Sequence, residues 1–473
     1  MDVGGDLIWG DDSESEVFAQ AQSQEMCVIF RYSLNPKLPE TLPSRIVTCY
    51  HDLPTEDACE TFPNRASMRE ALYSSIRGVW DQCIGHPSVT APDVTVEIYE
   101  DAERQNQWRI SHESLYNQYV ESLLSVSNIF RCGKVKFQVH NTIDYSRLAQ
   151  IRHLGGRGRT AVVRSSPSSK ALYVFKGVDF GAFLESRADF QHQRDVCYHE
   201  IRTISSLPKH PNIIPPPNTF VTVRKIGDDQ QAFICGALYP FMEHGTIDDQ
   251  IQNTKAAGAR LPLINKAAWC FQMASAIAHA HFTAHTFHMD IKPANFVLNS
   301  RKDLVLIDWE QSGAALYTLA PEADGSWDVK EARTGSSYRG GADSAGPKLV
   351  YEKYCGPDRE NLSWGRPKWN VFPRWRDLYP RALEAAEVFS LGRTMWMLLE
   401  QVTQSEVEDL DEVVVSWSDM VKDIPEDWKG VVSRCLDPDP NERIGLLELV
   451  DFWAAVQCKG RACSPCAPML SSV

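Results

Sequence analysis

The chain has 473 residues, a formal net charge of −14 and a sequence pI of about 5.4. This length is too great for a single hydrophobic core, so we expect more than one. The acidic balance argues against a general binder of nucleic acid or of anionic membranes, and no apolar run approaches the roughly 18 residues of a membrane span. The N-terminus lacks the features of a secretory signal, and the 13 scattered cysteines fit reduced thiols, so we predict a cytoplasmic or nuclear protein.

The first part of the chain predicts a tail and a small domain. Residues 1–24 are polar and acidic, which is typical of a disordered tail. Residues 25–142 show mixed α+β patterning, with strands expected at 26–32, 46–50, 94–99, 108–110 and 135–139, and helices at 68–80 and at 111–125 after an N-cap at Ser111. This order resembles a ubiquitin-like β-grasp domain, and an irregular α+β extension is the alternative. Either form is where we expect a protein partner to bind.

The pattern changes from about residue 146. Short strands come first, followed by helices at 195–207 and 264–284 with a strand pair near 232–241 between them. Residues 312–350 are rich in Gly, Ser, Ala and Asp and predict a long mobile loop. Helical patterning returns from 381 to 456, and residues 458–473 predict a flexible tail.

The residues that carry chemistry gather between the long helix and the mobile loop. Asp290 and Asn295 are five residues apart, and Asp308 lies thirteen residues further on. Two apolar runs, 296–298 and 304–307, predict a hairpin that brings Asn295 and Asp308 to the same end, where their oxygens suit Mg²⁺. Asp290 would accept the proton of an attacking hydroxyl, and Lys292 would neutralise a moving phosphoryl group.

This stretch resembles the catalytic loop and metal-binding turn of the eukaryotic protein kinase family. The resemblance implies ATP and Mg²⁺ as cofactors and a protein as substrate. It also implies an α+β, bilobal fold, with a β-rich small lobe at 146–238 and a helical large lobe at 239–457. The resemblance covers roughly residues 150–455.

Further motifs follow in the family's order. Residues 156–163 resemble the glycine-rich loop over the phosphates, with Gly156, Gly158 and Val163 in place and Ala161 where the family has its third glycine. Lys176 ends a predicted strand and would hold the α- and β-phosphates, and Glu200 on the next helix would pair with Lys176.

The hinge between the lobes is expected at residues 240–242. Tyr239 would guard the back of the adenine pocket, and backbone groups at Phe241 and Met242 would bind adenine.

Two acids compete for the end of the activation segment, the stretch that follows Asp308 in this family. Residues 354–358 resemble its usual ending, so we expect Asp358 to pair with Arg443. Glu322, in Ala320-Pro321-Glu322, spells the motif better but lies very close to Asp308.

Several residues depart from the family. Met289 replaces the arginine that often reads a phosphate on the activation segment, and we predict that phosphorylation at Thr334, Ser336, Ser337 or Tyr338 is not the main on-switch. Trp309-Glu310 replaces Phe-Gly, and because Glu310 lacks glycine's access to positive φ, we expect a turn locked in one state. Glu387 stands where the family has Asp.

The sequence therefore predicts a serine/threonine protein kinase, and Lys292 fits that class. A pseudokinase that acts as a scaffold is the alternative, motivated by the departures at Ala161, Met289, Glu310 and Glu387. A small-molecule kinase of related fold is a further alternative.

Overall fold

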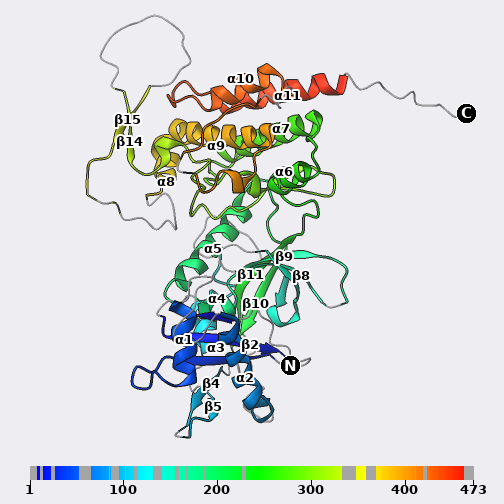
Figure 1. Ribbon diagram of the computed structural model, residues 1–473. Coiled ribbons are helices and arrows are strands. Elements are labelled where there is room, and N and C mark those ends of the chain that lie inside the picture. The colour runs from blue at the N-terminus through cyan, green and yellow to red at the C-terminus, as the bar shows by residue number, and fades with distance from the viewer. Residues whose placement is uncertain are drawn as a thin grey trace, which may run out of the picture. The chain divides into compact units, whose positions relative to one another are not determined.

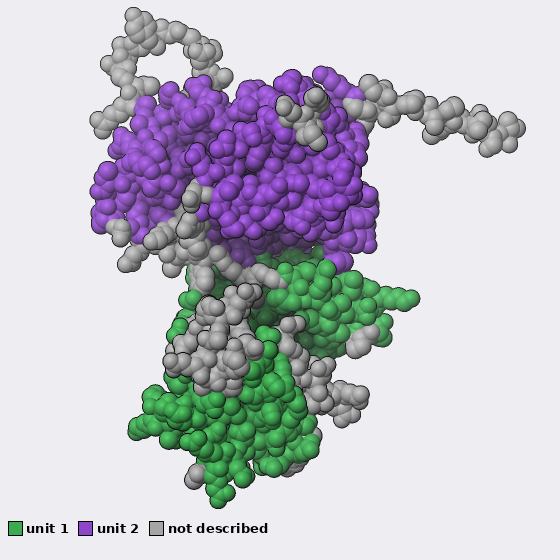
Figure 2. Space-filling view, in the orientation of Figure 1, with its two compact units in different colours: residues 1–198, 217–240 green, residues 199–216, 241–473 purple. Residues whose placement is uncertain are grey.

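The computed structural model forms two compact units, one of residues 1–198 and 217–240 and the other of residues 199–216 and 241–473 (Figures 1 and 2). It describes residues 8–10, 14–22, 27–52, 65–84, 86, 95–101, 103–110, 115–130, 141–154, 159–166, 168–185, 187–225, 231–332, 348–357, 359, 369–410, 412–418 and 423–462. Across these ranges, every helix is too short or too polar to cross a bilayer.

The first unit begins with a five-stranded sheet, which we call the N-terminal sheet. Its strands lie in the order β1-β2-β3-β4-β5, and β3 and β4 run parallel because α1 and α2 connect them. The strands are β1 (Ile8–Gly10), β2 (Glu16–Gln22), β3 (Cys27–Ser33), β4 (Thr95–Glu100) and β5 (Asn106–Ile110). The helices are α1 (Leu42–Asp52), α2 (Arg65–Ile84) and α3 (Leu115–Ser122).

Both faces of the N-terminal sheet are covered. Val17 and Ala19 of β2 pack in one core with α1 and α2, whereas Phe18 between them packs in a second core with α3 and the small lobe. Successive side chains of β3 also point to opposite faces of the sheet, so Phe30 packs in the first core and Ile29 packs against the second. The N-terminal sheet with α1, α2 and α3, which we call the N-terminal module, is therefore continuous with the small lobe.

Two predictions for this module were wrong. The predicted disordered tail contains β1 and β2, and Val17, Phe18 and Ala19 are fully buried. Residues 46–50, predicted as a strand, belong to α1. A contact distant in sequence favours the helix, because the Glu100 carboxylate accepts a 2.7 Å hydrogen bond from the first N–H of α1, at Leu42.

The helices predicted at 68–80 and 111–125 are confirmed by α2 and α3, and the strands predicted at 26–32, 94–99 and 108–110 are confirmed by β3, β4 and β5. Ser111 and residues 135–139 lie outside the described residues. The β-grasp interpretation rested on an order of elements that the structure changes, since a third strand and a second helix precede β4.

The small lobe is a six-stranded sheet in the order β6-β10-β11-β9-β8-β7. Phe175 of β9 and Val221 of β10 pack in the second core, with the aromatic side chains of α3 and of the helices that follow β9. The strands are β6 (Asn141–Asp144), β7 (Ala149–His153), β8 (Arg159–Arg164), β9 (Tyr173–Gly177), β10 (Thr219–Arg224) and β11 (Ala232–Pro240), and the helices are α4 (Phe180–Glu185) and α5 (Phe190–Ser206).

The second unit is mainly helical, as expected for a large lobe. The buried helix α9 packs on α7, and at Gly392 it approaches α10 so closely that a Cβ would lie 2.6 Å from the Cβ of Cys435. The helices are α6 (Ile247–Ala256), α7 (Leu263–Phe282), α8 (Phe372–Leu378), α9 (Pro380–Glu400), α10 (Glu426–Cys435) and α11 (Leu446–Ala462).

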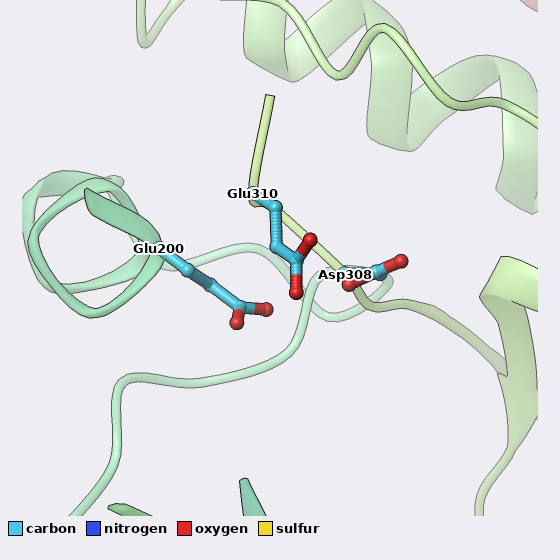
Figure 3. Close-up of side chains that lie close together, drawn as sticks. All are labelled: Glu200, Asp308 and Glu310. Atoms are coloured by element: carbon cyan, nitrogen blue, oxygen red, sulfur yellow. The ribbon is translucent and has the colours of Figure 1, made fainter. Parts of the chain in front are cut away.

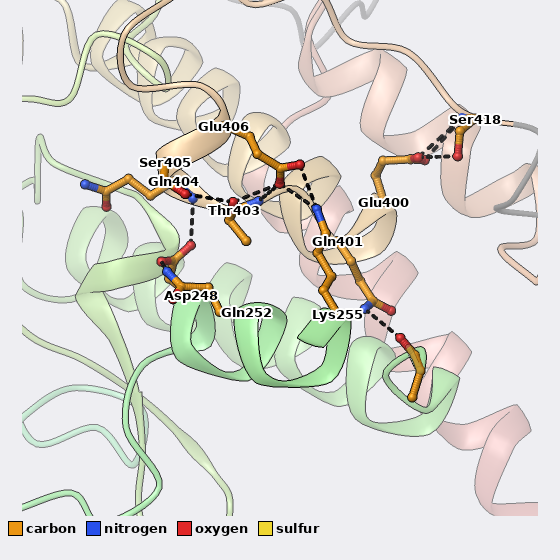
Figure 4. Close-up of polar contacts among 11 residues, drawn as sticks. Asp248, Gln252, Lys255, Glu400, Gln401, Thr403, Gln404, Ser405, Glu406 and Ser418 are labelled. Carbon is orange, nitrogen blue, oxygen red and sulfur yellow. Dashed lines mark hydrogen bonds and ion pairs between the residues drawn. The ribbon is translucent and has the colours of Figure 1, made fainter. Parts of the chain in front are cut away.

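Polar contacts join α6 to the turn that follows α9 (Figure 4). Lys255 forms a 2.6 Å ion pair with Glu406, and the Asp248 carboxylate accepts a 2.8 Å hydrogen bond from the backbone N–H of Gln404. These contacts fix α6, which precedes the catalytic loop, against the rest of the lobe.

The predicted mobile loop at 312–350 and flexible tail at 458–473 need correction. Strands β14 (Trp327–Glu331) and β15 (Leu349–Lys353) lie within the predicted loop and pair antiparallel. Residues 333–347, which connect them in sequence, lie outside the described residues. Helix α11 continues to Ala462, so residues 458–462 are helical, and the rest of the predicted tail lies outside the described residues.

We predict that Phe30→Ala lowers the free energy of unfolding by about 3–5 kcal/mol, because it empties a fully buried site against Trp80 in the first core. Urea denaturation measures the loss. Leu38→Ala, at a side chain that is 55% exposed, is the control and should change stability by less than about 0.5 kcal/mol. Equal losses for the two variants would contradict the assignment of this core.

Candidate active site

The loop after α7 is anchored by a buried carboxylate. Glu387 of α9 is fully buried and accepts hydrogen bonds from the backbone N–H groups of His288 (2.7 Å) and Met289 (2.6 Å), and from the His281 ring (2.6 Å). Burial raises the pKa of Glu387, but the hydrogen bond and charge of His281 and the N–H of Met289 outweigh it and lower the pKa below the usual value. The anchor is therefore ionised at neutral pH.

The predicted catalytic base, Asp290, is held by the groups around it. Its Oδ2 lies 2.7 Å from Lys292 Nζ and accepts a 3.0 Å hydrogen bond from Asn295 Nδ2, and its Oδ1 accepts a 2.8 Å bond from the backbone N–H of Ala315. Asn295 also donates to the backbone oxygen of Asp290. The structure thus brings Asp290, Lys292 and Asn295 together, as the sequence predicted.

The predicted hairpin is present. Strands β12 (Phe296–Leu298) and β13 (Leu304–Leu306) pair in antiparallel register, and the Ile307 N–H donates to the Asn295 carbonyl at 3.0 Å. Asn295 and Asp308 therefore flank the same end of the hairpin.

The turn at Asp308-Trp309-Glu310 is fixed from both sides. The Trp309 ring is fully buried and lies edge-on to the His288 ring, with centroids 4.8 Å apart. The backbone N–H of Trp309 donates to Glu200 Oε1 at 3.2 Å. Asp308 has φ 69° and the residue after the turn, Gln311, has φ 53°, whereas Glu310 is absent from the described residues with positive φ. The turn thus avoids the conformation that glutamate disfavours.

Three carboxylates gather at this turn. One oxygen each of Glu200, Asp308 and Glu310 lies within 4.8 Å of the others, and Figure 3 shows the Glu200 side chain directed from α5 toward Glu310. Such oxygens are ligands of the type that a hard divalent cation such as Mg²⁺ prefers. Glu310 is a candidate ligand that the sequence motif did not reveal, because the family has glycine there.

Met289 is buried in an apolar cluster, with φ 78°. A side chain in this environment cannot carry a charge toward solvent, which explains why the position holds no arginine. The cluster joins the catalytic loop to the segment after Asp308 and to α8 and α9, and contains Phe287, Met289, Leu319, Ala320, Ala323, Val329, Leu349, Val371, Phe372, Trp375, Ala382, Leu383, Ala386 and Phe389.

The end of the activation segment lies at Glu322, not at Asp358 as we expected. Both terminal nitrogens of Arg443 donate to the Glu322 carboxylate, at 2.5 and 3.0 Å, and both side chains are buried. Asp358 itself is outside the described residues. The sequence favoured Asp358 because Glu322 lies only a few residues after Asp308. The short segment between Asp308 and Glu322 nevertheless contacts the catalytic loop, since the backbone N–H of Ala315 donates to Asp290.

The hydroxyl groups of this short segment are inaccessible. Ser312, Tyr317 and Thr318 are all at least 92% buried. A kinase acting on this chain would therefore find no exposed hydroxyl between Asp308 and Glu322. Thr334, Ser336, Ser337 and Tyr338 lie outside the described residues, so their exclusion as the main on-switch stays a prediction.

The predicted nucleotide-binding residues of the small lobe lie on its sheet. Lys176 on β9 stands between Thr160 of β8 and Ala237 of β11. Strands β9 and β11 approach closely here, since a Cβ at Gly236 of β11 would lie 2.6 Å from the Lys176 carbonyl oxygen. Val163 is buried on β8, and Gly156 and Gly158 lie outside the described residues.

The remaining predicted residues occupy the expected elements. Tyr239 is buried near the end of β11, and Phe241 and Met242 follow it, half-buried, at the start of the second unit. The pairing of Lys176 with Glu200 stays a prediction, because the two residues belong to different units.

One ionic group near the glycine-rich loop was missed by sequence reasoning. Arg159, the first residue of β8, contacts Asp179 at 3.2 Å and Glu185 at 2.5 Å, and Tyr145 donates to Asp179. Burial lowers the pKa of Arg159, but the two carboxylates outweigh it and raise the pKa, so the side chain is a charged tether for the start of β8.

Comparison with known proteins agrees with this geometry. Residues 149–320 match the protein kinase domain family. The chain contains a protein kinase domain. The matched stretch begins with β7 and runs to the residues just before Glu322, so it includes Lys176, Glu200 and the whole catalytic loop.

A curated relative gives a shorter match to this chain. The chain is 31% identical over 80 residues to dual specificity mitogen-activated protein kinase kinase 1 of Dictyostelium discoideum. This stretch covers 17% of the present chain and 12% of the relative.

We predict that Glu322→Gln lowers the free energy of unfolding by about 3 kcal/mol, the low end for breaking a buried ion pair, because glutamine keeps one acceptor for Arg443. Asp358→Asn is the matched control and should leave stability unchanged. Urea denaturation of both variants measures the difference. The opposite ranking would restore Asp358 as the partner of Arg443.

Proposed function

We propose that this kinase domain transfers the γ-phosphate of ATP to serine or threonine hydroxyls of protein substrates. The observation that carries the proposal is the Asp290 carboxylate, held by Lys292 and Asn295 on a loop that Glu387 anchors. The position of Lys292 supports the serine/threonine class.

The residues divide the work of the reaction. Asp290 orients the attacking hydroxyl and accepts its proton, and Asn295 sets the angle of the Asp290 carboxylate. The Lys292 ammonium lies beside Asp290, where it would balance the charge of the phosphoryl group in the transition state.

The donor set also fits a metal. Asn295 and Asp308 would hold Mg²⁺, with Glu310 as a further oxygen ligand, and the bound ion would neutralise phosphate charge. On the small lobe, Lys176 would bind the α- and β-phosphates. By the family resemblance, Val163 and Tyr239 and the backbone groups at Phe241 and Met242 are the candidate residues for binding the adenosine.

One contact favours a second candidate function, that of a non-catalytic scaffold. The Ala315 N–H already donates to Asp290 Oδ1, the side on which a substrate hydroxyl would compete. Lys292 and Asn295 both contact Oδ2, but Oδ1 receives only the Ala315 N–H among the contacts described and keeps a lone pair for a substrate hydroxyl, so we prefer the catalytic function.

We predict that Asp290→Asn lowers the rate of phosphate transfer from labelled ATP and Mg²⁺ to generic protein substrates by about 10²–10⁴-fold, the range for loss of a general base. ATP binding should persist in the variant. Asp377→Asn, on an exposed aspartate paired with Arg376, is the control and should transfer at the wild-type rate. If the wild-type chain binds ATP but transfers no more than Asp290→Asn, the scaffold function is correct.

A further inference from the structure

The segment after α3, at residues 124–126, pairs with β11 in the small-lobe sheet. After α3, Ser125 pairs with Phe233 of β11 in antiparallel register, so Leu124 stands opposite Ile234. The Ile234 N–H donates to the Leu124 carbonyl at 2.9 Å, and the Val126 N–H donates to the Ala232 carbonyl at 3.2 Å.

The reciprocal bond between Leu124 and Ile234 is made through a side chain of α5. The Tyr198 hydroxyl accepts a 2.9 Å hydrogen bond from the Leu124 N–H and donates a 2.7 Å bond to the Ile234 carbonyl. Tyr198 is fully buried, so both backbone groups depend on this hydroxyl for a partner. A single oxygen thus joins the N-terminal module, the sheet and α5.

Two more residues of α5 face the module on the same side. The Arg194 guanidinium donates to the Ser122 carbonyl at the C-terminal end of α3, where the helix dipole favours a cation. The Phe190 ring packs against the Tyr119 ring, with centroids 5.7 Å apart. Phe190, Arg194 and Tyr198 are spaced by four residues and form one face of α5.

Glu200 lies on the other face of the same helix. It follows Tyr198 by two residues, which turns it about 200° around the helix axis. Because α5 is a continuous helix, the contacts at Phe190, Arg194 and Tyr198 set both its rotation and its axial position, and hence the position of Glu200.

We propose that residues 115–126 clamp α5 and that Tyr198 is a positioning residue for phosphate transfer, acting through Glu200. This inference rests on the proposed function of the kinase domain. Its consequence is that the N-terminal module acts as a permanent part of the catalytic unit, because misplacing a helix that carries a site residue lowers the rate without altering the chemistry.

The first test compares two tyrosines in the full-length chain. Tyr198→Phe removes the bridging hydroxyl, and Tyr32→Phe makes the same change at a fully buried tyrosine of the module that bonds Ser75 and Leu72 instead. Thermal unfolding should show similar losses for both. We expect kcat/KM for ATP to fall about tenfold or more only in Tyr198→Phe, since small misplacements have effects of this size. Equal activities of the two variants would overturn the clamp.

The second test does not depend on activity. Amide hydrogen exchange over α5 should be faster in Tyr198→Phe than in Tyr32→Phe and the wild type, and Arg194→Gln should act in the same direction as Tyr198→Phe. If the wild type transfers no phosphate, the proposed function fails and the exchange rates decide the clamp alone. Unchanged exchange in α5 would then reject it.

Discussion

The arrangement of the site depends on one buried carboxylate. Glu387 takes the backbone N–H groups of two consecutive residues, His288 and Met289, and this fixes the loop just before Asp290 in an unusual conformation, with positive φ at Met289. A carboxylate with no exposure to water persists in this state because His281 and two N–H donors compensate its desolvation. Asp290, Lys292 and Asn295 then acquire their mutual geometry from a loop that is already set.

A second set of contacts holds the catalytic loop at Met289, where the family often has an arginine. Met289 packs among apolar residues of α8, α9 and the short activation segment, and Glu322 closes that segment on Arg443. The segment's own hydroxyls are buried. Packing and a buried ion pair therefore hold the catalytic loop, and our central claim is that the domain is assembled for transfer without a phosphate on residues 308–350.

The sequence could predict the features that depend on local order. The spacing of Asp290, Lys292, Asn295 and Asp308 and the apolar runs of the β12–β13 hairpin lie within twenty residues, so their geometry follows from a turn and a hairpin. Features decided by distant partners were missed. Helix α1 is capped by Glu100, 58 residues away, and Arg443 bonds Glu322, 121 residues away. The motif at residues 354–358 and the short spacing from Asp308 to Glu322 had favoured Asp358 instead. Glu310 was recognised as a departure but not as a candidate ligand, since its carboxylate attracts attention only beside those of Glu200 and Asp308.

The most direct test of the central claim is the transfer rate of the full-length chain after phosphatase treatment, with intact mass confirming that no phosphate remains. Labelled ATP, Mg²⁺ and a generic protein substrate give the initial rate. The account predicts the same rate for the treated and untreated chain, because buried contacts hold the site. An inactive dephosphorylated chain that regains transfer when residues 333–347 are phosphorylated would contradict it.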